Sequence, residues 1–90
     1  MKKILVIDDE PILRGMVKQG LEDGHFEVFE AADSIEGANM ARELLPDLIL
    51  CDINMDKAGA GFTMLSKLRE DGATATIPFI LMTGMADPAG

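Results

Sequence analysis

Three aspartates in two distant parts of the chain are the side chains best suited to chemistry. Asp8 and Asp9 follow the apolar run 4–7, and Asp52 follows the apolar run 48–51. Continuous apolar runs of this kind are typical of strands buried on both faces of a parallel sheet. If the two strands are neighbours, as in a strand order of 2-1-3-4, the three carboxylates converge in the crevice beyond the strand ends.

Carboxylates this close together must either take up protons or be neutralised by a cation, because each negative charge raises the cost of ionising its neighbours. A cluster of oxygen ligands suits Mg²⁺ or Mn²⁺, which would keep coordination sites open for a phosphoryl oxygen. A carboxylate beside such an ion can accept a phosphoryl group as an aspartyl phosphate. Thr83 follows another apolar run, 79–82, and we expect its hydroxyl on the same rim, where it can donate to a phosphoryl oxygen.

The elements that must position these residues alternate along the chain as strand and helix. Pro11 suits the first turn of a helix, and Gly24 closes that helix. Asp33 and Glu36 resemble a capping pair at the start of a second helix, which Pro46 stops. Together these patterns predict an α/β fold with a parallel sheet and right-handed crossovers. The predicted strands are 4–7, 26–31, 48–51 and 79–82, and the predicted helices are 11–23, 35–45 and 62–71.

Individual side chains within these elements also carry predictions. Glu27 and Glu30 interrupt the second strand, which indicates a position at the edge of the sheet. Cys51 lies within a buried strand and is expected to be a small core residue. Met55 is expected near the rim that carries the aspartates. The methionines expected in the core are Met16, Met40, Met64 and Met82.

Length and composition limit the classes of protein that fit. With 90 residues against roughly 150 for a typical domain, residues 1–90 are expected to form a single domain. The net charge of −8 argues against direct binding of nucleic acid, which requires a basic surface. One cysteine excludes an internal disulfide, and no apolar run reaches the ~20 residues of a membrane span or the shorter core of a signal peptide. We therefore expect a cytoplasmic protein with no membrane partner.

Three segments that carry the aspartates and Thr83 resemble the receiver domain of bacterial two-component response regulators. These segments are 3–11, 46–55 and 77–84, in the family's order and each at a strand end. The resemblance covers essentially the whole chain. It implies a flavodoxin-like open parallel sheet, with the strand order 2-1-3-4 carried over from the family. It also implies a signalling domain that promotes its own aspartyl phosphorylation, rather than an enzyme.

The resemblance implies a role for each matching residue. Asp52 corresponds to the phosphoacceptor, Asp9 to the direct metal ligand, and Asp8 to the ligand that acts mainly through water. Asn54 corresponds to the residue whose backbone carbonyl completes the Mg²⁺ site, and Thr83 to the hydroxyl that contacts the phosphoryl group. The implied phosphoryl donor is a phosphohistidine on a sensor histidine kinase or histidine phosphotransfer protein, or a small acyl phosphate.

The sequence departs from the family pattern in two places. Family members continue with a helix, a strand that carries an active-site lysine, and a last helix, and no lysine of this chain matches that position. We therefore expect a C-terminally truncated receiver, or a fragment of a longer product, with weakened phosphotransfer and output. Strand 79–82 would then be an exposed sheet edge, which predicts self-association with a second copy through this strand or by exchange of an element. Asp56 replaces a family proline, with one added residue, which predicts a more flexible loop.

Three other functions compete with a phosphoacceptor. A receiver-like module that binds a partner without phosphorylation would fit the missing lysine. A Mg²⁺-dependent phosphohydrolase with an aspartate nucleophile usually has an Asp-x-Asp pair, whereas Asn54 holds the second position here and cannot take a proton from water. A flavin mononucleotide carrier needs hydrogen-bond donors in its first strand–helix turn, where this chain has carboxylates.

Overall fold

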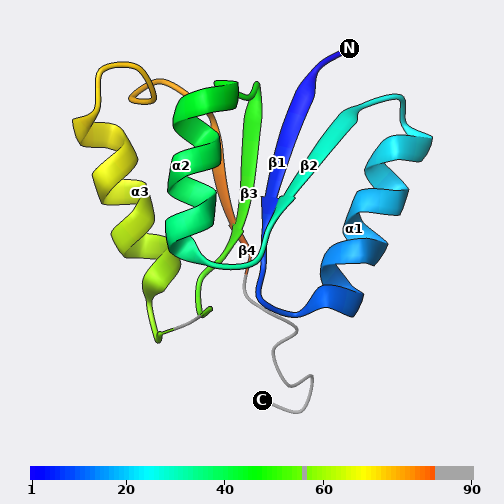
Figure 1. Cartoon of the computed structure of the whole chain (residues 1–90), viewed down its shortest axis with the longest axis horizontal. Coiled ribbons are helices and arrows are strands. Elements are labelled where there is room, and N and C mark those ends of the chain that lie inside the picture. Colours follow the sequence, from blue (N-terminus) through cyan, green and yellow to red (C-terminus); the bar gives the residue numbers. More distant parts are fainter. Residues whose placement is uncertain (56, 83–90) are drawn as a thin grey trace.

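Parallel strands and helices alternate along the part of the chain that the computed structural model describes, residues 1–55 and 57–82 (Figure 1). The elements are β1 (Lys3–Ile7), α1 (Pro11–Asp23), β2 (Glu27–Ala31), α2 (Ser34–Leu44), β3 (Leu48–Asp52), α3 (Ala60–Glu70) and β4 (Phe79–Met82). The strand order β2-β1-β3-β4 confirms the flavodoxin-like sheet, and the boundaries lie within two residues of the predicted ones. Within the described ranges no helix is both long and apolar enough for a bilayer span.

β1 lies inside the sheet and pairs with both β2 and β3. Its last residue, Ile7, lies opposite Ala31 of β2 and Cys51 of β3. Asp8 and Asp52, each one residue further along, therefore reach the same carboxyl edge of neighbouring strands. The edge position predicted for β2 from its glutamates is also confirmed.

The helices cover both faces of the sheet, with α1 on one face and α2 and α3 on the other (Figure 1). Successive residues of a strand point to opposite faces, so Leu5 and Ile7 pack with α2 and α3, whereas Ile4 and Val6 pack against α1. The step from β1 to β2 runs along the sheet in the opposite direction to the later steps. Crossovers of a single hand therefore require α1 to lie on the face opposite α2 and α3.

Local hydrogen bonds and backbone angles set the ends of the first two helices. Asp33 caps α2 by accepting a hydrogen bond from the Glu36 amide at 2.8 Å, as the sequence predicts. The Glu36 carboxylate accepts a 2.8 Å hydrogen bond from the amide of Ala32 (the reciprocal half of the box, shifted by one residue). At the end of α1 the left-handed residue is His25, with φ of 69°, whereas Gly24 has an ordinary φ of −85°.

The structure corrects the predicted positions of two methionines. Met64 is 2% exposed and lies in the core between the sheet and the paired helices, as predicted. Met16 is 67% exposed, because α1 presents Val17 and Leu21 to the sheet and leaves Met16 outside that contact. Met55 is buried in the same cluster as Met64, rather than lying at the rim.

α3 begins so close to β3 that its second residue must be a glycine. A Cβ at Gly61 would lie 2.5 Å from the backbone oxygen of Asp52 and 2.9 Å from the Cα of Ile53, and contacts this short do not occur. The Gly61 amide also donates a hydrogen bond to the Ile53 carbonyl at 2.8 Å. Gly61 therefore holds the first turn of α3 against the end of β3 that carries Asp52.

Replacing Gly61 by alanine is expected to lower the free energy of unfolding by about 1–3 kcal/mol, because the new methyl group overlaps rigid backbone atoms. Gly15→Ala is the matched control. Gly15 lies within α1, a Cβ there would meet nothing within 4 Å, and alanine in a helix interior stabilises by about 0.5–1 kcal/mol over glycine. Urea denaturation followed by circular dichroism measures both changes. Equal effects of the two substitutions would contradict a packing role for Gly61.

Candidate functional site

Three carboxylates meet at the carboxyl edge of β1 and β3. Asp8 and Asp9 follow β1, and Asp52 is the last residue of β3. One carboxylate oxygen from each lies within 4.8 Å of the others, so the convergence expected from the strand ends is present in the structure. Asp8 and Asp52 are buried, with exposed fractions of 1% and 6%, whereas Asp9 is exposed. The cluster therefore opens to solvent on the side of Asp9.

Asp8 is held by the backbone around it. Its amide donates to the Ala31 carbonyl at 3.1 Å, and its side-chain Oδ1 accepts a hydrogen bond from the Glu10 amide at 2.9 Å. Burial raises the pKa of Asp8 above its ordinary value of 3.8, and the charges of Asp52 and Asp9 raise it further. The Glu10 hydrogen bond and, to a smaller extent, the charge of Arg14 lower the pKa and offset part of this rise. In its charged form this side chain is therefore electrostatically unfavourable without a counter-charge.

Asp52 keeps one oxygen engaged and one available. Its Oδ1 accepts a hydrogen bond from the Asn54 amide at 3.2 Å, which fixes the orientation of the carboxylate. Among the described residues no group donates to its Oδ2. A carboxylate held in this way at the end of a buried strand can act as a ligand or as a nucleophile without first breaking a hydrogen bond.

The loop after β3 is organised by Asn54. Its side-chain Oδ1 accepts a 2.7 Å hydrogen bond from the amide of Gly59, which has a φ of 75° and precedes α3. The backbone carbonyl of Asn54, the group that the resemblance assigns to a metal ion, receives no hydrogen bond from the residues the structure describes. Thr83, the expected phosphoryl-contacting hydroxyl, lies outside the described residues.

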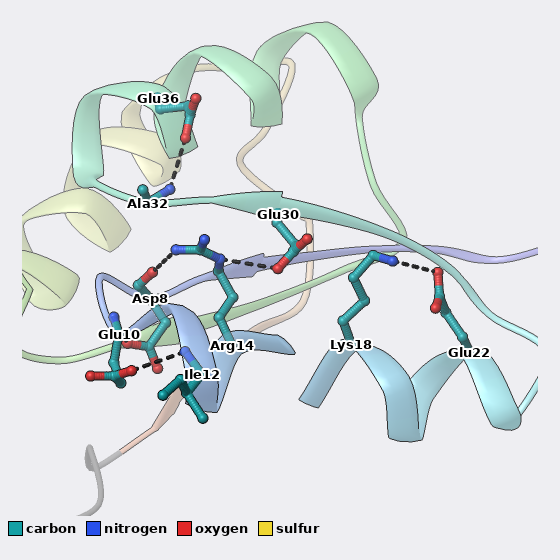
Figure 2. A network of polar contacts seen from close by, with 9 residues as sticks. All are labelled: Asp8, Glu10, Ile12, Arg14, Lys18, Glu22, Glu30, Ala32 and Glu36. Carbon is teal, nitrogen blue, oxygen red and sulfur yellow. Dashed lines mark hydrogen bonds and ion pairs between the residues drawn. The ribbon is translucent and has the colours of Figure 1, made fainter. Parts of the chain in front are cut away.

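Arg14 supports the site and was missed by the sequence analysis. Its Nη1 donates to the backbone carbonyl of Asp8 at 2.6 Å, and its Nε pairs with the Glu30 carboxylate at 3.1 Å (Figure 2). The guanidinium thus links the end of β1 to β2 and to the first turns of α1. Figure 2 also shows the Glu10 carboxylate accepting from the Ile12 amide, so the turn after Asp8 is tied down from both ends. The sequence signal that could have identified Arg14 is its position as a basic residue early in the helix that follows the acidic pair Asp8 and Asp9.

The site fits a hard divalent cation by the chemistry of its donors. Its side chains supply only oxygen ligands, and one of them, Asp8, is buried with a raised pKa. The guanidinium of Arg14 is already engaged by a carbonyl and by Glu30, so it cannot balance three carboxylates. Mg²⁺ and Mn²⁺ favour carboxylate, carbonyl and water oxygens.

Comparison with known proteins identifies relatives of this arrangement. The family model for the response regulator receiver domain matches residues 4–89. The DNA-binding dual master transcriptional regulator RpaA of Synechocystis sp. is 40% identical over 85 residues, which are 94% of this chain and 35% of that protein. The nitrate/nitrite response regulator protein NarP of Escherichia coli is 40% identical over 77 residues, or 83% of this chain and 35% of that protein.

A solved structure shows the same fold. The chemotaxis response regulator CheY4 of Vibrio cholerae superposes with a TM-score of 0.87 at 31% identity, covering 99% of this chain and 73% of that one. The chain therefore spans about a third of the length of the curated relatives it matches, and nearly three quarters of this structural relative.

Asp8→Asn is expected to stabilise the protein near neutral pH when no divalent ion is present. A carboxyl with a raised pKa binds its proton more tightly when folded than when unfolded, so its ionisation destabilises the fold as pH rises above about 3.8. Asparagine removes that charge and keeps an oxygen for the Glu10 amide. The gain in the free energy of unfolding should be large at pH 7 and shrink as pH falls through the Asp8 pKa, measured by urea denaturation.

Glu27→Gln is the control for this experiment, because it removes one negative charge from an exposed position on the edge strand β2. Its effect should be small at every pH. A stabilisation by Asp8→Asn that is independent of pH, or that Glu27→Gln matches, would assign the effect to net charge rather than to the cluster.

Proposed function

The chain belongs to the response regulator receiver domain family, and we propose that it accepts a phosphoryl group on Asp52 from a phosphohistidine donor. The convergence of Asp8, Asp9 and Asp52 within 4.8 Å at the carboxyl edge of the sheet carries this proposal. Receiver domains are signalling domains, and the proposed activity is phosphorylation of the chain itself rather than turnover of a substrate.

In the proposed step, Oδ2 of Asp52, which accepts no hydrogen bond from the described residues, attacks the phosphorus atom of the donor. The new O–P bond forms on Asp52 as the P–N bond of the donor breaks, and the imidazole nitrogen keeps the electron pair and takes a proton from water. The Asn54 amide, 3.2 Å from Oδ1, holds the carboxylate in one orientation during the transfer. Positioning of this kind is most of what a protein contributes to phosphoryl transfer.

The residues proposed to hold a divalent ion are Asp8, Asp9, Asp52 and the backbone carbonyl of Asn54. A bound Mg²⁺ or Mn²⁺ would supply positive charge against the three carboxylates and the incoming phosphoryl oxygens. Burial and the Glu10 amide keep Asp8 in place, and Asp9 faces solvent at the open side of the cluster. Thr83 remains the proposed donor to a phosphoryl oxygen.

The proposed donors are a sensor histidine kinase or a histidine phosphotransfer protein, acting in the cytoplasm. We propose no direct contact between this chain and nucleic acid, because its net charge is −8. RpaA is described as DNA-binding, but this chain covers only 35% of that protein, so DNA binding is not proposed for this 90-residue chain.

Incubation with Mg²⁺ and acetyl phosphate tests the phosphoacceptor. Intact-mass spectrometry should show a single added phosphoryl group on the wild-type chain and on Asp23→Asn, in which an exposed aspartate at the end of α1 is changed. The adduct should be lost, at least about tenfold in occupancy, in Asp52→Asn, which keeps an oxygen for the Asn54 amide but has no anionic nucleophile.

Two other results of this experiment would contradict the proposal. Release of many phosphates per chain from phosphate esters would indicate a phosphohydrolase. A wild-type chain that forms no adduct with acetyl phosphate and no beryllofluoride complex by fluorine NMR, with or without Mg²⁺, would indicate a receiver-like module that binds its partner without phosphorylation.

We also propose that the 90-residue chain pairs with a second copy through β4. Within the described residues β4 is hydrogen-bonded only to β3, and Ile80 at its centre is 50% exposed. An apolar strand at a sheet edge favours pairing with another chain. Light scattering should give the mass of a dimer at low micromolar concentration and of a monomer for Ile80→Lys. A monomeric wild-type chain would exclude this interface.

A further inference from the structure

A groove between α2 and α3 lies apart from the acidic cluster. It has a volume of about 420 Å³, and side chains of α2, of α3 and of the loop that leads into α3 line it. None of its lining residues belongs to the carboxylate cluster. The volume is within the range of roughly 300–1,000 Å³ that is usual for ligand sites.

The lining of this groove combines an apolar base with a basic rim. Met64 is buried at 2% exposure, whereas Ile35, in the first turn of α2, is 74% exposed. Arg42, Lys57 and Lys67 also line the groove, so it gathers three of the eight basic residues in a chain of net charge −8. Among the residues that the structure describes, those that line the groove include no carboxylate.

Within the described ranges, most of this positive charge has no close negative partner. Arg42 pairs with Asp71 at 3.4 Å, but both side chains are over a third exposed, and exposed pairs of this kind are weak. Neither Lys57 nor Lys67 has an ion-pair partner among the residues the structure describes. By contrast, Arg14 and Lys18 on the other side of the molecule are paired with Glu30 and Glu22 (Figure 2).

We propose that this groove docks an acidic peptide segment of a partner protein, with an apolar side chain against Ile35 and Met64 and carboxylates near Arg42, Lys57 and Lys67. Charge complementarity identifies the occupant, because the groove gathers three basic side chains, whereas the rest of the chain has eleven more acidic than basic residues. A single-stranded nucleic acid fits less well, because the groove has no aromatic side chain on which a base can stack. An exposed isoleucine beside a buried methionine gives an anchoring apolar residue a place to bind.

Titration with a synthetic peptide tests the proposal. The probe is a capped pentapeptide with the order Glu-Asp-Leu-Glu-Asp, and the readout is amide NMR on the full 90-residue chain at low salt. Shifts that saturate and that concentrate on residues of α2, α3 and the loop before α3 are expected. The same peptide with lysine at the four acidic positions should cause no saturable shift.

Two matched double variants separate the groove from net charge. Lys57→Gln with Lys67→Gln should weaken peptide binding about tenfold, the loss expected when two charge contacts are removed. Lys2→Gln with Lys18→Gln changes the net charge equally but lies outside the groove, and it should change the affinity less than about twofold. The dispersion of the NMR spectra shows whether each variant is folded.

Ile35→Ser tests the apolar part of the groove without a change of charge. It should lower the affinity for the peptide several-fold, although the charges of the groove are unchanged. Equal affinity in the two lysine double variants, shifts outside the groove, or tighter saturable binding of an oligothymidine than of the peptide at the groove would each overturn the proposal. None of these readouts depends on phosphorylation of Asp52, so failure here is distinguishable from failure of the proposed function.

Discussion

Crowding of negative charge at the carboxyl edge of β1 and β3 is the constraint on which the rest of the structure depends. Three carboxylates lie within 4.8 Å of one another, and two of them are buried. Folding must therefore bring like charges together, and the apolar layers on both faces of the sheet must more than offset that cost. Because the cluster lowers the stability of the fold, its presence is better explained by a function than by a contribution to folding.

Backbone hydrogen bonds prevent the carboxylates from moving apart to relieve this repulsion. The Glu10 amide holds one oxygen of Asp8, and the Asn54 amide holds one oxygen of Asp52, so both carboxylates are kept in place within the cluster. Arg14 adds a third restraint by binding the carbonyl of Asp8 rather than its carboxylate, so it fixes position and neutralises little charge. The site is therefore held in place by its own backbone and by Arg14, an arrangement that would lower the cost of binding an ion or a phosphoryl group.

The sequence predicted the elements well because apolar runs and helix breakers are local signals. Glu27 and Glu30 placed β2 at an edge, but the order of the strands came from the family resemblance, since periodicity says nothing of which strands are neighbours. Gly61 was interpreted as a loop residue, because its close approach to Asp52 depends on how α3 meets β3. Arg14 was missed for a similar reason, since its partners are a carbonyl and a carboxylate brought near only by the sheet. The prediction that Met16 lies in the core was wrong because an apolar residue can lie beside the buried face of a helix without being part of it.

The loop between β3 and α3 joins the two surfaces of opposite charge. It begins one residue after Asp52, and its residue Lys57 lines the basic groove. The Asn54 side chain binds the Gly59 amide across the loop, Met55 is buried in the core, and the Met55 amide donates to the Lys57 carbonyl. These contacts anchor residues on both sides of the described part of the loop, and its greater flexibility stays a prediction. The acidic cluster and the basic groove therefore share this loop, since Asp52 precedes it and Lys57 lies within it.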